Sequence, residues 1–524
     1  MKTSNIIAGK EVKGSGKTFN AYNPATQSEL EGDFEVATIE NVNHATQKAV
    51  EAFKIYKNTS GKIKAEFLRT IANEIEALGD ALIQRASMES GLPEGRFKGE
   101  RGRTCGQLRL FADLVEEGSW VEARIDEALP DRKPMPRADI RNMLQPLGPV
   151  VIFGASNFPL AFSTAGGDTV SALAAGCPVI VKAHPSHPGT NAMVSEAIAN
   201  ALEKCNLPAG IYSTLYDTGH SIGAALVQHS EITAVGFTGS ERGGKALMDL
   251  AAQREHPIPV YAEMGSTNPV FILSQKLENE LETLPGQIAG SVNMGVGQFC
   301  TNPGLLFVKE DENLELFTAN LARAFEGLKA FTMLNKGIHK NYISKRNEAL
   351  ETIGVSPLYA DDKTAGTLSA PPTVIKISYD EFNKNPNLHE EIFGPFTALV
   401  VYKDPTQMKE MIQNLKGQLT ATFLGTESDL EANADLIDAV RDKVGRIVFN
   451  GVPTGVEVGH AMHHGGPFPA ASNGRYTSVG TGAIKRFARP IAWQNCPESL
   501  LPDALKNGNP LGIWRMLNGE MSKA

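Results

Sequence analysis

Apolar residues recur along this chain with two different spacings, and each spacing predicts a different kind of element. From residue 38 to residue 90 the apolar positions fall at helical spacing, which predicts two amphipathic helices. The apolar face of the second helix consists of Leu68, Ile71, Ile75 and Leu78. This helix is expected to stop at the Gly-Leu-Pro that follows Ser90, and a further helix is predicted from about Arg96 to Glu117.

The second spacing begins at residue 149, where short apolar runs alternate with helical stretches. The first set of runs covers 149–153, 178–182, 211–216, 232–237 and 259–263. A second set begins at about Asn268 and covers 304–308, 396–402, 420–425 and 446–450. Such alternation is typical of parallel, doubly wound sheets. The predicted fold class is therefore α/β, with two doubly wound domains and a site between them.

One stretch follows neither spacing. In residues 121–148, prolines and charges alternate with apolar residues, which suits an extended arm better than a core element. We expect this arm to pair with another subunit, together with the strand-like stretch 484–494, because exposed strand edges otherwise invite aggregation.

Length and charge narrow the possible functions. A chain of 524 residues is too long for a single core. The net charge of −9 comes from 59 acidic and 50 basic residues that are dispersed along the chain, which argues against nucleic-acid and membrane partners. No stretch approaches the roughly 18 apolar residues of a spanning helix, and the N-terminus lacks the apolar core of a signal peptide. We therefore expect a soluble, cytoplasmic protein.

The five cysteines form neither a CxxC pair nor an evenly spaced framework. They are Cys105, Cys177, Cys205, Cys300 and Cys496. This usage predicts no disulfide scaffold and no metal site, and it suits a reducing compartment. Cys300 differs from the others because it lies in GVGQFCTNPG, residues 295–304, between two glycine turns. Glycines let a backbone approach a ligand closely, so this loop is expected to expose its thiol.

Four more unusual segments lie where predicted strands end. They are GASNFP (154–159), KAHPSHP (182–188), GFTGSERGG (236–244) and EMGSTNP (263–269). Ligands in open α/β sheets bind at the carboxyl ends of the strands. We therefore expect these segments and the Cys300 loop to converge on one site.

Together these motifs resemble the aldehyde dehydrogenase superfamily, in family order and over roughly residues 20–490. The matching segments are Asn157-Phe158-Pro159, Lys182, Phe237-Thr238-Gly239-Ser240, Glu263-Met264-Gly265-Ser266, Gly297-Gln298-Phe299-Cys300 and Glu391-Ile392-Phe393-Gly394-Pro395. Within the superfamily, the chain looks most similar to the 2-oxoglutarate semialdehyde (2,5-dioxovalerate) dehydrogenases and to an NADP-linked fatty aldehyde dehydrogenase group.

The resemblance implies a division of the chain into domains. A cofactor-binding domain is expected over 1–120 and 149–262, and a catalytic domain over 263–480. An oligomerisation arm would comprise 121–148 and 484–497, followed by a C-terminal tail over 498–524. Self-association as a dimer or tetramer is the expected partnership.

The resemblance also implies a reaction. An aldehyde carbon cannot release hydride while it is a planar carbonyl, but addition of a thiolate makes an alkoxide whose collapse passes hydride to NAD or NADP and leaves a thioester. Cys300 is the expected nucleophile, and the Asn157 amide and the Cys300 backbone N–H are the expected donors to the alkoxide. Glu263 is the expected base for thioester hydrolysis. From the residues alone, Asn157 could instead be a turn or helix cap, and Glu263 could be an ion-pair partner.

Several further residues are implied to bind the cofactor. Lys182 would reach the adenosine ribose, and Glu391, beside Phe393, would reach the nicotinamide ribose. The loop from Gly236 to Gly243 would lie near the pyrophosphate, through Gly236, Thr238, Gly239, Ser240, Arg242 and Gly243. The Gly-x-Gly-x-x-Gly fingerprint is absent, as in the superfamily. NADP is expected to be accepted because Pro185 stands where NAD-selective relatives carry a glutamate that repels the 2′-phosphate.

Substrate-binding residues follow from helical spacing and from the resemblance. Arg103 and Gln107 lie four residues apart and share one helix face, and the resemblance puts Arg103 at the substrate tunnel. Ala165 stands where many relatives carry tryptophan and leaves room for a guanidinium, whose fork suits a carboxylate. The inferred substrate is 2-oxoglutarate semialdehyde. Alternatively, Arg103 pairs with Glu100 or another acid as a solvated helix charge.

The other residues assigned to the substrate side are Phe158 and His464. His463 and His464 could lie at the substrate mouth or be bystanders. Ser266 and Ser156 depart from the family pattern, where glycine and tryptophan are usual.

Four alternative functions remain open at this point. One is an NADP-dependent fatty or broad-specificity aldehyde dehydrogenase. Another is a superfamily enzyme that handles acyl-CoA or acyl phosphate, against which Glu263 argues. A cysteine acyl-hydrolase without redox chemistry would need a histidine within reach of Cys300 but not Lys182 or Glu391. A non-catalytic binding protein would not need the Cys, Asn and Glu set.

Overall fold

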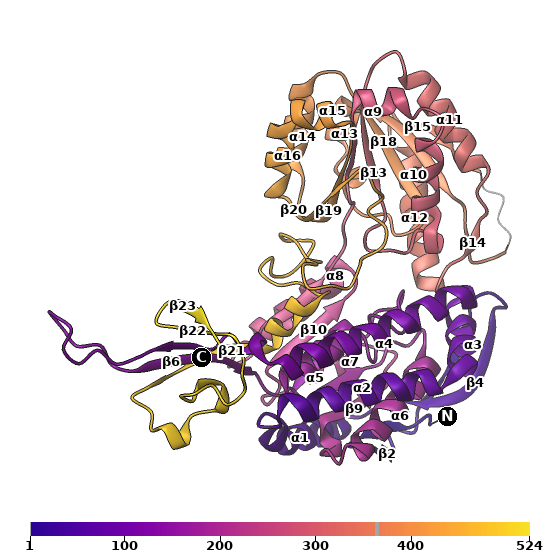
Figure 1. Ribbon diagram of the computed structural model, residues 1–524. Helices are drawn as coiled ribbons and strands as arrows, with labels where there is room; N and C mark the ends of the chain where they lie inside the picture. Colours follow the sequence, from indigo (N-terminus) through magenta and orange to yellow (C-terminus); the bar gives the residue numbers. More distant parts are fainter. Residues whose placement is uncertain (1, 362–365, 524) are drawn as a thin grey trace.

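The protein is described by a computed structural model that covers residues 2–361 and 366–523. Figure 1 shows two α/β lobes, one formed mainly by the N-terminal half of the chain and one by the C-terminal half, with a narrow arm that projects from the first lobe. The expected α/β class with two doubly wound sheets is confirmed.

The N-terminal helical region contains one more helix than its periodicity predicted. It comprises α1 Ile39–Tyr56, α2 Gly61–Ala77 and α3 Gly79–Ser90, followed by α4 Glu94–Glu117. Leu78, expected inside the second helix, lies at the junction between α2 and α3, and Gly79 there has φ +59°. The prediction of two helices was wrong because a left-handed glycine breaks the backbone without interrupting the apolar spacing.

The first sheet has the strand order β11-β10-β7-β8-β9-β1-β2. Its parallel strands are β7 Val150–Phe153, β8 Val179–Lys182, β9 Tyr212–Leu215, β10 Ala234–Thr238 and β11 Val260–Glu263. The antiparallel edge is β1 Asn5–Ile7 and β2 Lys10–Val12. All five runs predicted for this domain are strands.

Helices cover both faces of this sheet because successive strand residues point to opposite sides. Val151 and Ile180 pack with α1, whereas Val150 and Ile152 lie in the core shared with α2 and α4. The remaining helices of this lobe are α5 Gly167–Ala175, α6 Pro188–Lys204, α7 Ser221–Gln228 and α8 Glu241–Ala252.

The second sheet has the order β15-β17-β18-β13-β12-β19-β20 and is parallel except for the β15–β17 pair. The four predicted runs are β13 Leu305–Lys309, β18 Phe396–Tyr402, β19 Gln418–Leu424 and β20 Val444–Phe449. Three strands had no individual prediction: β12 Val270–Ile272, β15 Ser356–Tyr359 and β17 Thr373–Ser378. The helices of this lobe are α9 Ser274–Asn279, α10 Leu284–Asn293, α11 Leu314–Glu326, α12 Lys336–Glu351, α13 Tyr379–Lys384, α14 Pro405–Asn414, α15 Glu427–Ala432 and α16 Ala434–Arg441. Two antiparallel strand pairs complete the fold: β3 Thr18–Asn23 with β4 Ser28–Glu35, and β14 Phe331–Thr332 with β16 Ser369–Ala370.

The arm is a five-stranded sheet with the order β21-β6-β5-β22-β23. Its strands are β5 Arg124–Asp126, β6 Ile140–Pro146, β21 Ala488–Gln494, β22 Arg515–Leu517 and β23 Glu520–Ser522. The strand expected from 484 begins only at Ala488, because Thr481–Phe487 forms a 3-10 helix. Residues 498–523, set apart as a tail in the sequence analysis, contribute two strands to this sheet.

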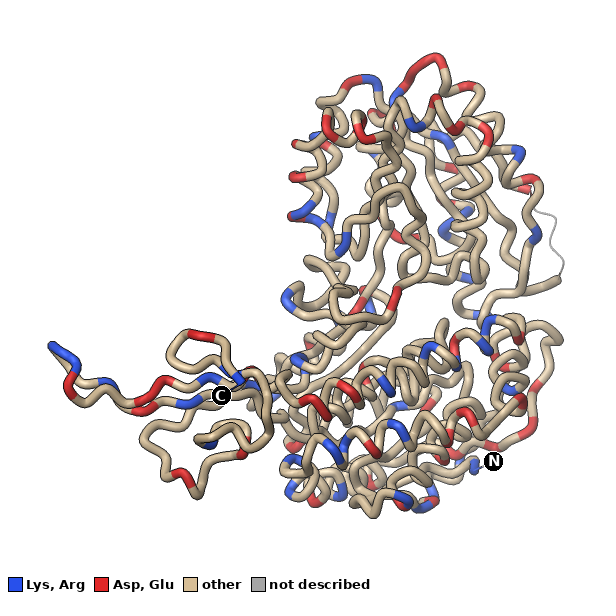
Figure 2. The backbone as a smooth tube through the Cα atoms, viewed as in Figure 1, with Lys and Arg blue, Asp and Glu red and all other residues tan. Residues whose placement is uncertain are grey.

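Charges are spread over the molecule rather than gathered on one face (Figure 2). Lys and Arg alternate with Asp and Glu over both lobes in the view shown. Within residues 2–361 and 366–523, no helix is long and apolar enough to cross a membrane.

A buried ion pair ties the C-terminal segment to the first lobe. Nη1 of Arg486 lies 2.7 Å from Oδ1 of Asp168, and Nη2 donates to the hydroxyl of Ser171 on the same helix, α5. Both charged side chains are almost fully excluded from solvent. This ion pair holds the C-terminal segment, which carries β21, β22 and β23, against α5.

Arg486→Leu should destabilise the protein by about 3–5 kcal/mol, because it leaves the Asp168 carboxylate buried without a counter-charge. Calorimetry should show a lower Tm. The double variant Asp168→Asn/Arg486→Leu should recover much of the loss, since neither charge remains. An unchanged Tm for the single variant would contradict this account.

Candidate active site

The strand order of the first sheet reverses at β7, with β8 and β9 on one side and β10 and β11 on the other. Such a reversal leaves a crevice at the carboxyl ends of the strands, where ligands bind. Lys182 is the last residue of β8, Thr238 of β10 and Glu263 of β11. Asn157 lies in the turn after β7. The expected convergence of the strand-end motifs therefore follows from the sheet order.

Residues 264–269 carry the chain from β11 to β12, which belongs to the second sheet. Asn268 lies in this crossing with φ +47°, and its Nδ2 donates to the carbonyl oxygens of Cys300 and Asn302, at 2.9 Å each. Oε1 of Gln418 accepts from the backbone N–H groups of Thr267 (2.7 Å) and Asn268 (3.2 Å). The crossing thereby anchors the cysteine loop through buried amides.

Ser266, which departs from the glycine usual in the family, belongs to the same network. Its hydroxyl lies 2.8 Å from Oε1 of Gln418 and 2.9 Å from Oδ1 of Asn268, and it accepts from the backbone N–H of Leu419. A buried hydroxyl of this kind is stable only when its hydrogen bonds are made. The departure thus adds an anchor to the crossing.

The backbone before Cys300 is in an uncommon conformation. Gly295, Val296 and Gly297 all have positive φ, at 57°, 61° and 63°. A Cβ on Gly297 would lie 2.2 Å from the carbonyl of Gly394, so only glycine lets the two backbones meet. Left-handed Val296 is strained because it is β-branched, and strain of this kind is maintained at functional sites. The cysteine loop is thereby pressed against the segment that follows Glu391.

Cys300, His464 and Glu263 lie in contact. Nε2 of His464 is 3.4 Å from Sγ of Cys300 and 2.9 Å from Oε1 of Glu263. The hydroxyl of Ser478 donates to the other carboxylate oxygen of Glu263 at 2.6 Å. His464 and Glu263 are buried, whereas Cys300 is partly exposed. The imidazole is therefore placed to exchange a proton with either neighbour.

Burial and partners shift the two acids in opposite directions. Burial raises the pKa of the Cys300 thiol well above its ordinary value, and the charge of Glu263 adds to this, whereas Arg103 opposes it. Burial also disfavours the Glu263 carboxylate, but His464, Ser478 and Cys300 outweigh it and hold the pKa of Glu263 below its ordinary value. At rest the proton therefore stays on sulfur and the carboxylate is charged.

The side-chain amide of Asn157 is bonded to the cysteine loop. Its Nδ2 donates to the carbonyl oxygen of Gln298 at 3.0 Å, two residues before Cys300. The backbone carbonyl of Asn157 accepts from Nη2 of Arg96 at 2.8 Å. Asn157 thereby links the segment after β7 to the cysteine loop and to α4.

Arg103 lies near this group and lacks a carboxylate partner among the described residues. Its Nη2 donates to the Val456 carbonyl at 3.3 Å, its guanidinium lies 5.0 Å from the centre of the Phe162 ring, and Nη1 is buried without a hydrogen bond. Glu100 is occupied elsewhere, since Oε1 accepts from two backbone N–H groups and Oε2 faces Arg96 at 3.7 Å. The alternative that Arg103 pairs with Glu100 was wrong.

Three phenylalanine rings pack together beside Arg103 and His464. The Phe158 ring packs edge-on against Phe162 and Phe299, at centroid distances of 5.3 and 5.1 Å, and Arg96 lies over Phe158 and Phe299. Phe162 also lies 6.5 Å from the His464 ring. Neither Phe162 nor Arg96 was predicted to belong to the site; Arg96 lies seven residues before Arg103 on α4, a spacing that could have suggested it.

Two expected substrate residues lie deeper than the rest. Gln107 is buried, with Nε2 unpartnered in the part of the chain that is described and close to Gly167. Ala165 is 3% exposed and belongs to the main core. Neither has a contact with Cys300 among those that the structure records.

The cofactor-side residues divide between strand, turn and helix. Nζ of Lys182 is buried and donates to the Asp217 carbonyl at 2.9 Å. Gly236 and Thr238 are inside β10, so the expected loop from Gly236 to Gly243 shrinks to a turn at Gly239 and Ser240. A Cβ on Gly236 would lie 2.7 Å from the Ile152 side chain, which explains this glycine by packing. Ser240 caps α8 by accepting from the Gly243 N–H, and Arg242 is exposed in its first turn.

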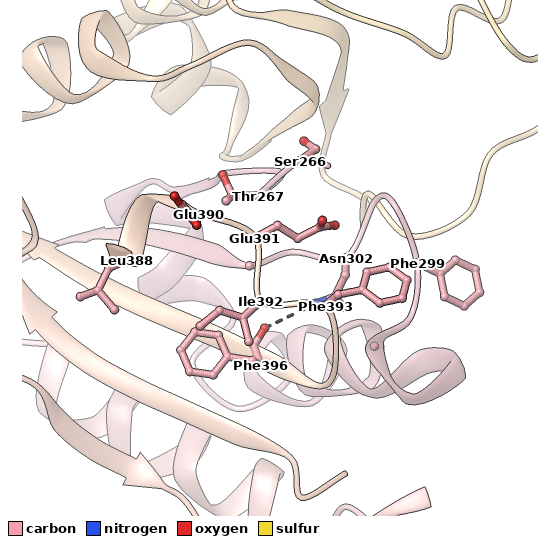
Figure 3. Close-up of a pocket in the computed structure, with 12 residues that line it drawn as sticks. Ser266, Thr267, Phe299, Asn302, Leu388, Glu390, Glu391, Ile392, Phe393 and Phe396 are labelled. Atoms are coloured by element: carbon pink, nitrogen blue, oxygen red, sulfur yellow. Dashed lines mark hydrogen bonds between the residues drawn. The ribbon is translucent and has the colours of Figure 1, made fainter. Parts of the chain in front are cut away.

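Glu391 and Phe393 line a small pocket together with residues of the cysteine loop and of the crossing 264–269 (Figure 3). The pocket is lined by Ser266, Thr267, Gly297, Phe299, Asn302, Gly304, Leu388, Glu390, Glu391, Ile392, Phe393 and Phe396. Burial raises the pKa of Glu391 to about 7, although Lys345 and the Ser266 N–H favour its charged form. Its carboxyl group can therefore donate or accept a hydrogen bond near neutral pH.

This set of donors fits a dinucleotide. A buried ammonium group and the N-terminus of the twelve-residue helix α8 lie at the strand ends of the first sheet, and the Glu391 carboxyl group lies in the pocket beside the cysteine loop, as the ribose hydroxyls and phosphates of NAD(P) require. A cysteine acyl-hydrolase required a histidine within reach of Cys300, and His464 meets that requirement. The distinction between the two classes therefore needs more than the Cys–His contact.

Comparisons with known proteins provide the evidence that separates the two classes. The aldehyde dehydrogenase family profile matches residues 12–478. The chain is 45% identical to alpha-ketoglutaric semialdehyde dehydrogenase 2 of Azospirillum brasilense, over 98% of each chain. It is 43% identical to alpha-ketoglutaric semialdehyde dehydrogenase of Acinetobacter baylyi, over 99% of this chain and 98% of that one. The fold matches 1-pyrroline-5-carboxylate dehydrogenase from Thermus with bound NAD, at 20% identity, a TM-score of 0.78 and coverage of 94% and 92%.

The family match spans most of the chain and includes every motif on which the resemblance was based. The acyl-hydrolase and binding-protein alternatives are therefore set aside. The chain belongs to the aldehyde dehydrogenase family and is an NAD(P)-dependent oxidoreductase that acts on an aldehyde.

Proposed function

We propose that the enzyme oxidises a short aldehyde with a distal carboxylate, 2-oxoglutarate semialdehyde, to 2-oxoglutarate. The observation that carries this proposal is the half-buried guanidinium of Arg103, whose buried Nη1 has no partner among the described residues. A cation with an unpartnered buried nitrogen favours an anionic ligand, and its fork matches a carboxylate. The names of the two relatives at 43–45% identity point to the same substrate.

In the proposed mechanism, His464 passes its Nε2 proton to Oε1 of Glu263, 2.9 Å away, and takes the proton of the Cys300 thiol through the same nitrogen. Ser478 holds the Glu263 side chain in place, and Glu263 later gives its proton to solvent. The thiolate then adds to the aldehyde carbon. The Asn157 amide and the Cys300 N–H would donate to the resulting alkoxide, which requires Nδ2 to release the Gln298 carbonyl.

NAD(P), when bound, accepts the hydride that the alkoxide releases. Lys182 and the turn at Gly239 and Ser240 would hold its adenosine side, and Glu391 with Phe393 its nicotinamide side. Glu263, freed from Cys300, would then activate the water that hydrolyses the thioester. NADP should be accepted because Pro185 offers no charge against a 2′-phosphate, and exposed Arg242 adds a cation.

The arm is proposed to join subunits into a dimer or tetramer. Exposed apolar side chains gather on it and on the C-terminal segment, at Leu129, Met135, Ile140, Leu500, Trp514 and Met521. Strand β21 forms one edge of the arm sheet, so a partner strand could extend it. We also propose a cytoplasmic location, where reducing conditions would keep the five cysteines free, as they are here.

Cys300→Ser should reduce aldehyde-dependent formation of NAD(P)H to below a few per cent, because a hydroxyl is a much weaker nucleophile. Calorimetry should show that the variant still binds the cofactor. Cys496→Ser, which alters a cysteine in the arm region, should keep wild-type turnover. Substantial turnover in Cys300→Ser, or none in the wild type across several aldehydes, would refute the proposed reaction.

Arg103→Leu should lower kcat/KM for 2-oxoglutarate semialdehyde by roughly 30- to 1,000-fold, since a desolvated charge-assisted contact is lost. Oxidation of a neutral aldehyde such as hexanal should change little. Arg103→Lys should fall between the two, because it keeps the charge but not the fork. An equal loss on both substrates would mean that Arg103 is structural.

Light scattering at micromolar concentration should give the mass of a dimer or tetramer for the wild type. The double variant Ile140→Lys/Trp514→Lys should shift the protein toward the monomer by charging the arm. Ile55→Lys changes an apolar residue on α1 that is more exposed than either, away from the arm, and should leave the mass unaltered. A monomeric wild type would contradict the proposed assembly.

A further inference from the structure

The side chains of Cys300, His464 and Glu263 are all of kinds that can bind a metal ion. A thiol sulfur, an imidazole nitrogen and a carboxylate oxygen, from Cys300, His464 and Glu263, all lie within 4.8 Å of one another. No spacing in the sequence suggests a metal site, because these ligands come from three distant parts of the chain. The combination of sulfur, nitrogen and oxygen donors is the one that Zn²⁺ prefers.

The observed separations are close to those of a tetrahedral zinc site. Zinc bonds of about 2.3 Å to sulfur and about 2.0–2.1 Å to nitrogen place the two ligand atoms roughly 3.5 Å apart. Sγ of Cys300 and Nε2 of His464 are 3.4 Å apart. Nε2 and Oε1 of Glu263, at 2.9 Å, would separate by about half an ångström, to roughly 3.4 Å. Small side-chain shifts therefore suffice.

The surroundings favour the exchange of a proton for a metal ion. Ser478 donates to Oε2 of Glu263, so the carboxylate keeps one hydrogen bond when Oε1 turns from His464 to the ion. Nδ1 of His464 is buried with no partner among the described residues and can take the imidazole proton, while bonds to the ion replace the hydrogen bond between Nε2 and Oε1. Cys300 is partly exposed, which gives an ion a route of entry.

The geometry points to an inhibitory site for Zn²⁺ on Cys300, His464 and Glu263 of the resting enzyme. The ion displaces the thiol proton, which passes to the buffer, and binds the thiolate, Nε2 and Oε1; water takes the fourth position. No electron is transferred. Zinc-bound sulfur has its lone pair engaged and cannot add to an aldehyde, so the enzyme is switched off until a chelator removes the ion. This inference rests on the arrangement of the three side chains and not on the identity of the substrate.

Calorimetric titration of the full-length, cofactor-free enzyme with Zn²⁺ tests the site directly. We expect one Zn²⁺ per chain and proton release, seen when buffers of different ionisation enthalpy are compared. Mg²⁺ should not compete, because hard cations prefer all-oxygen sites. Titration with Co²⁺ should produce a thiolate-to-cobalt charge-transfer band in the near ultraviolet.

Cys300→Ala and His464→Phe should each weaken Zn²⁺ binding by about 100-fold or more, and Cys300→Ala should lack the cobalt band. The matched controls Cys496→Ala and His463→Ala remove the same residue types elsewhere and should bind as the wild type does. If His464→Phe does not fold, His464→Gln replaces it. Binding that survives in both site variants, or no binding at one ion per chain, overturns the proposal. Loss of Zn²⁺ binding and loss of aldehyde oxidation are measured separately, so either can fail alone.

Discussion

The site depends above all on the six-residue crossing between the two sheets. Glu263 ends β11 and Val270 begins β12, so residues 264–269 connect Glu263 directly to the second lobe. Asn268, held by Gln418, binds the carbonyls of Cys300 and Asn302. An unmade hydrogen bond is costly where no water can replace it. The distance between the cysteine loop and Glu263 is therefore set by a buried polar network and not by loop flexibility.

A second constraint joins the Cys300 loop to the segment that contains Glu391. The Gly297 backbone touches the Gly394 carbonyl so closely that no side chain fits between them. Glu391 lies three residues before Gly394, in the pocket that the same loop lines. The strained conformation of Val296 is sustained by this contact and by its burial. Cys300 and Glu391 are thus positioned by one backbone-to-backbone contact.

Buried Glu263 and half-buried Glu391 differ in protonation because their neighbours differ. Glu263 has His464 and Ser478 against it, which hold its pKa below the ordinary value despite burial. Burial dominates at Glu391 and raises its pKa to about 7. One residue type thereby supplies a charged partner for the imidazole and a carboxyl group that can donate or accept. Arg103, which has no carboxylate partner among the described residues, adds a positive potential that favours the thiolate of Cys300.

The sequence by itself determined the alternation of strands and helices, the α/β class, the strand-end motifs and the importance of Cys300, because apolar spacing and glycine turns are local properties. The tertiary structure decided what local spacing cannot carry: the break at Gly79, the three-residue strand β12 and the position of Gly236 inside a strand. Above all, it decided the role open to His464, which is 164 residues from Cys300 and 201 from Glu263 along the chain. Only the packing of the C-terminal segment onto the end of β11, with Ser478 bound to the same carboxylate, brings that imidazole between them.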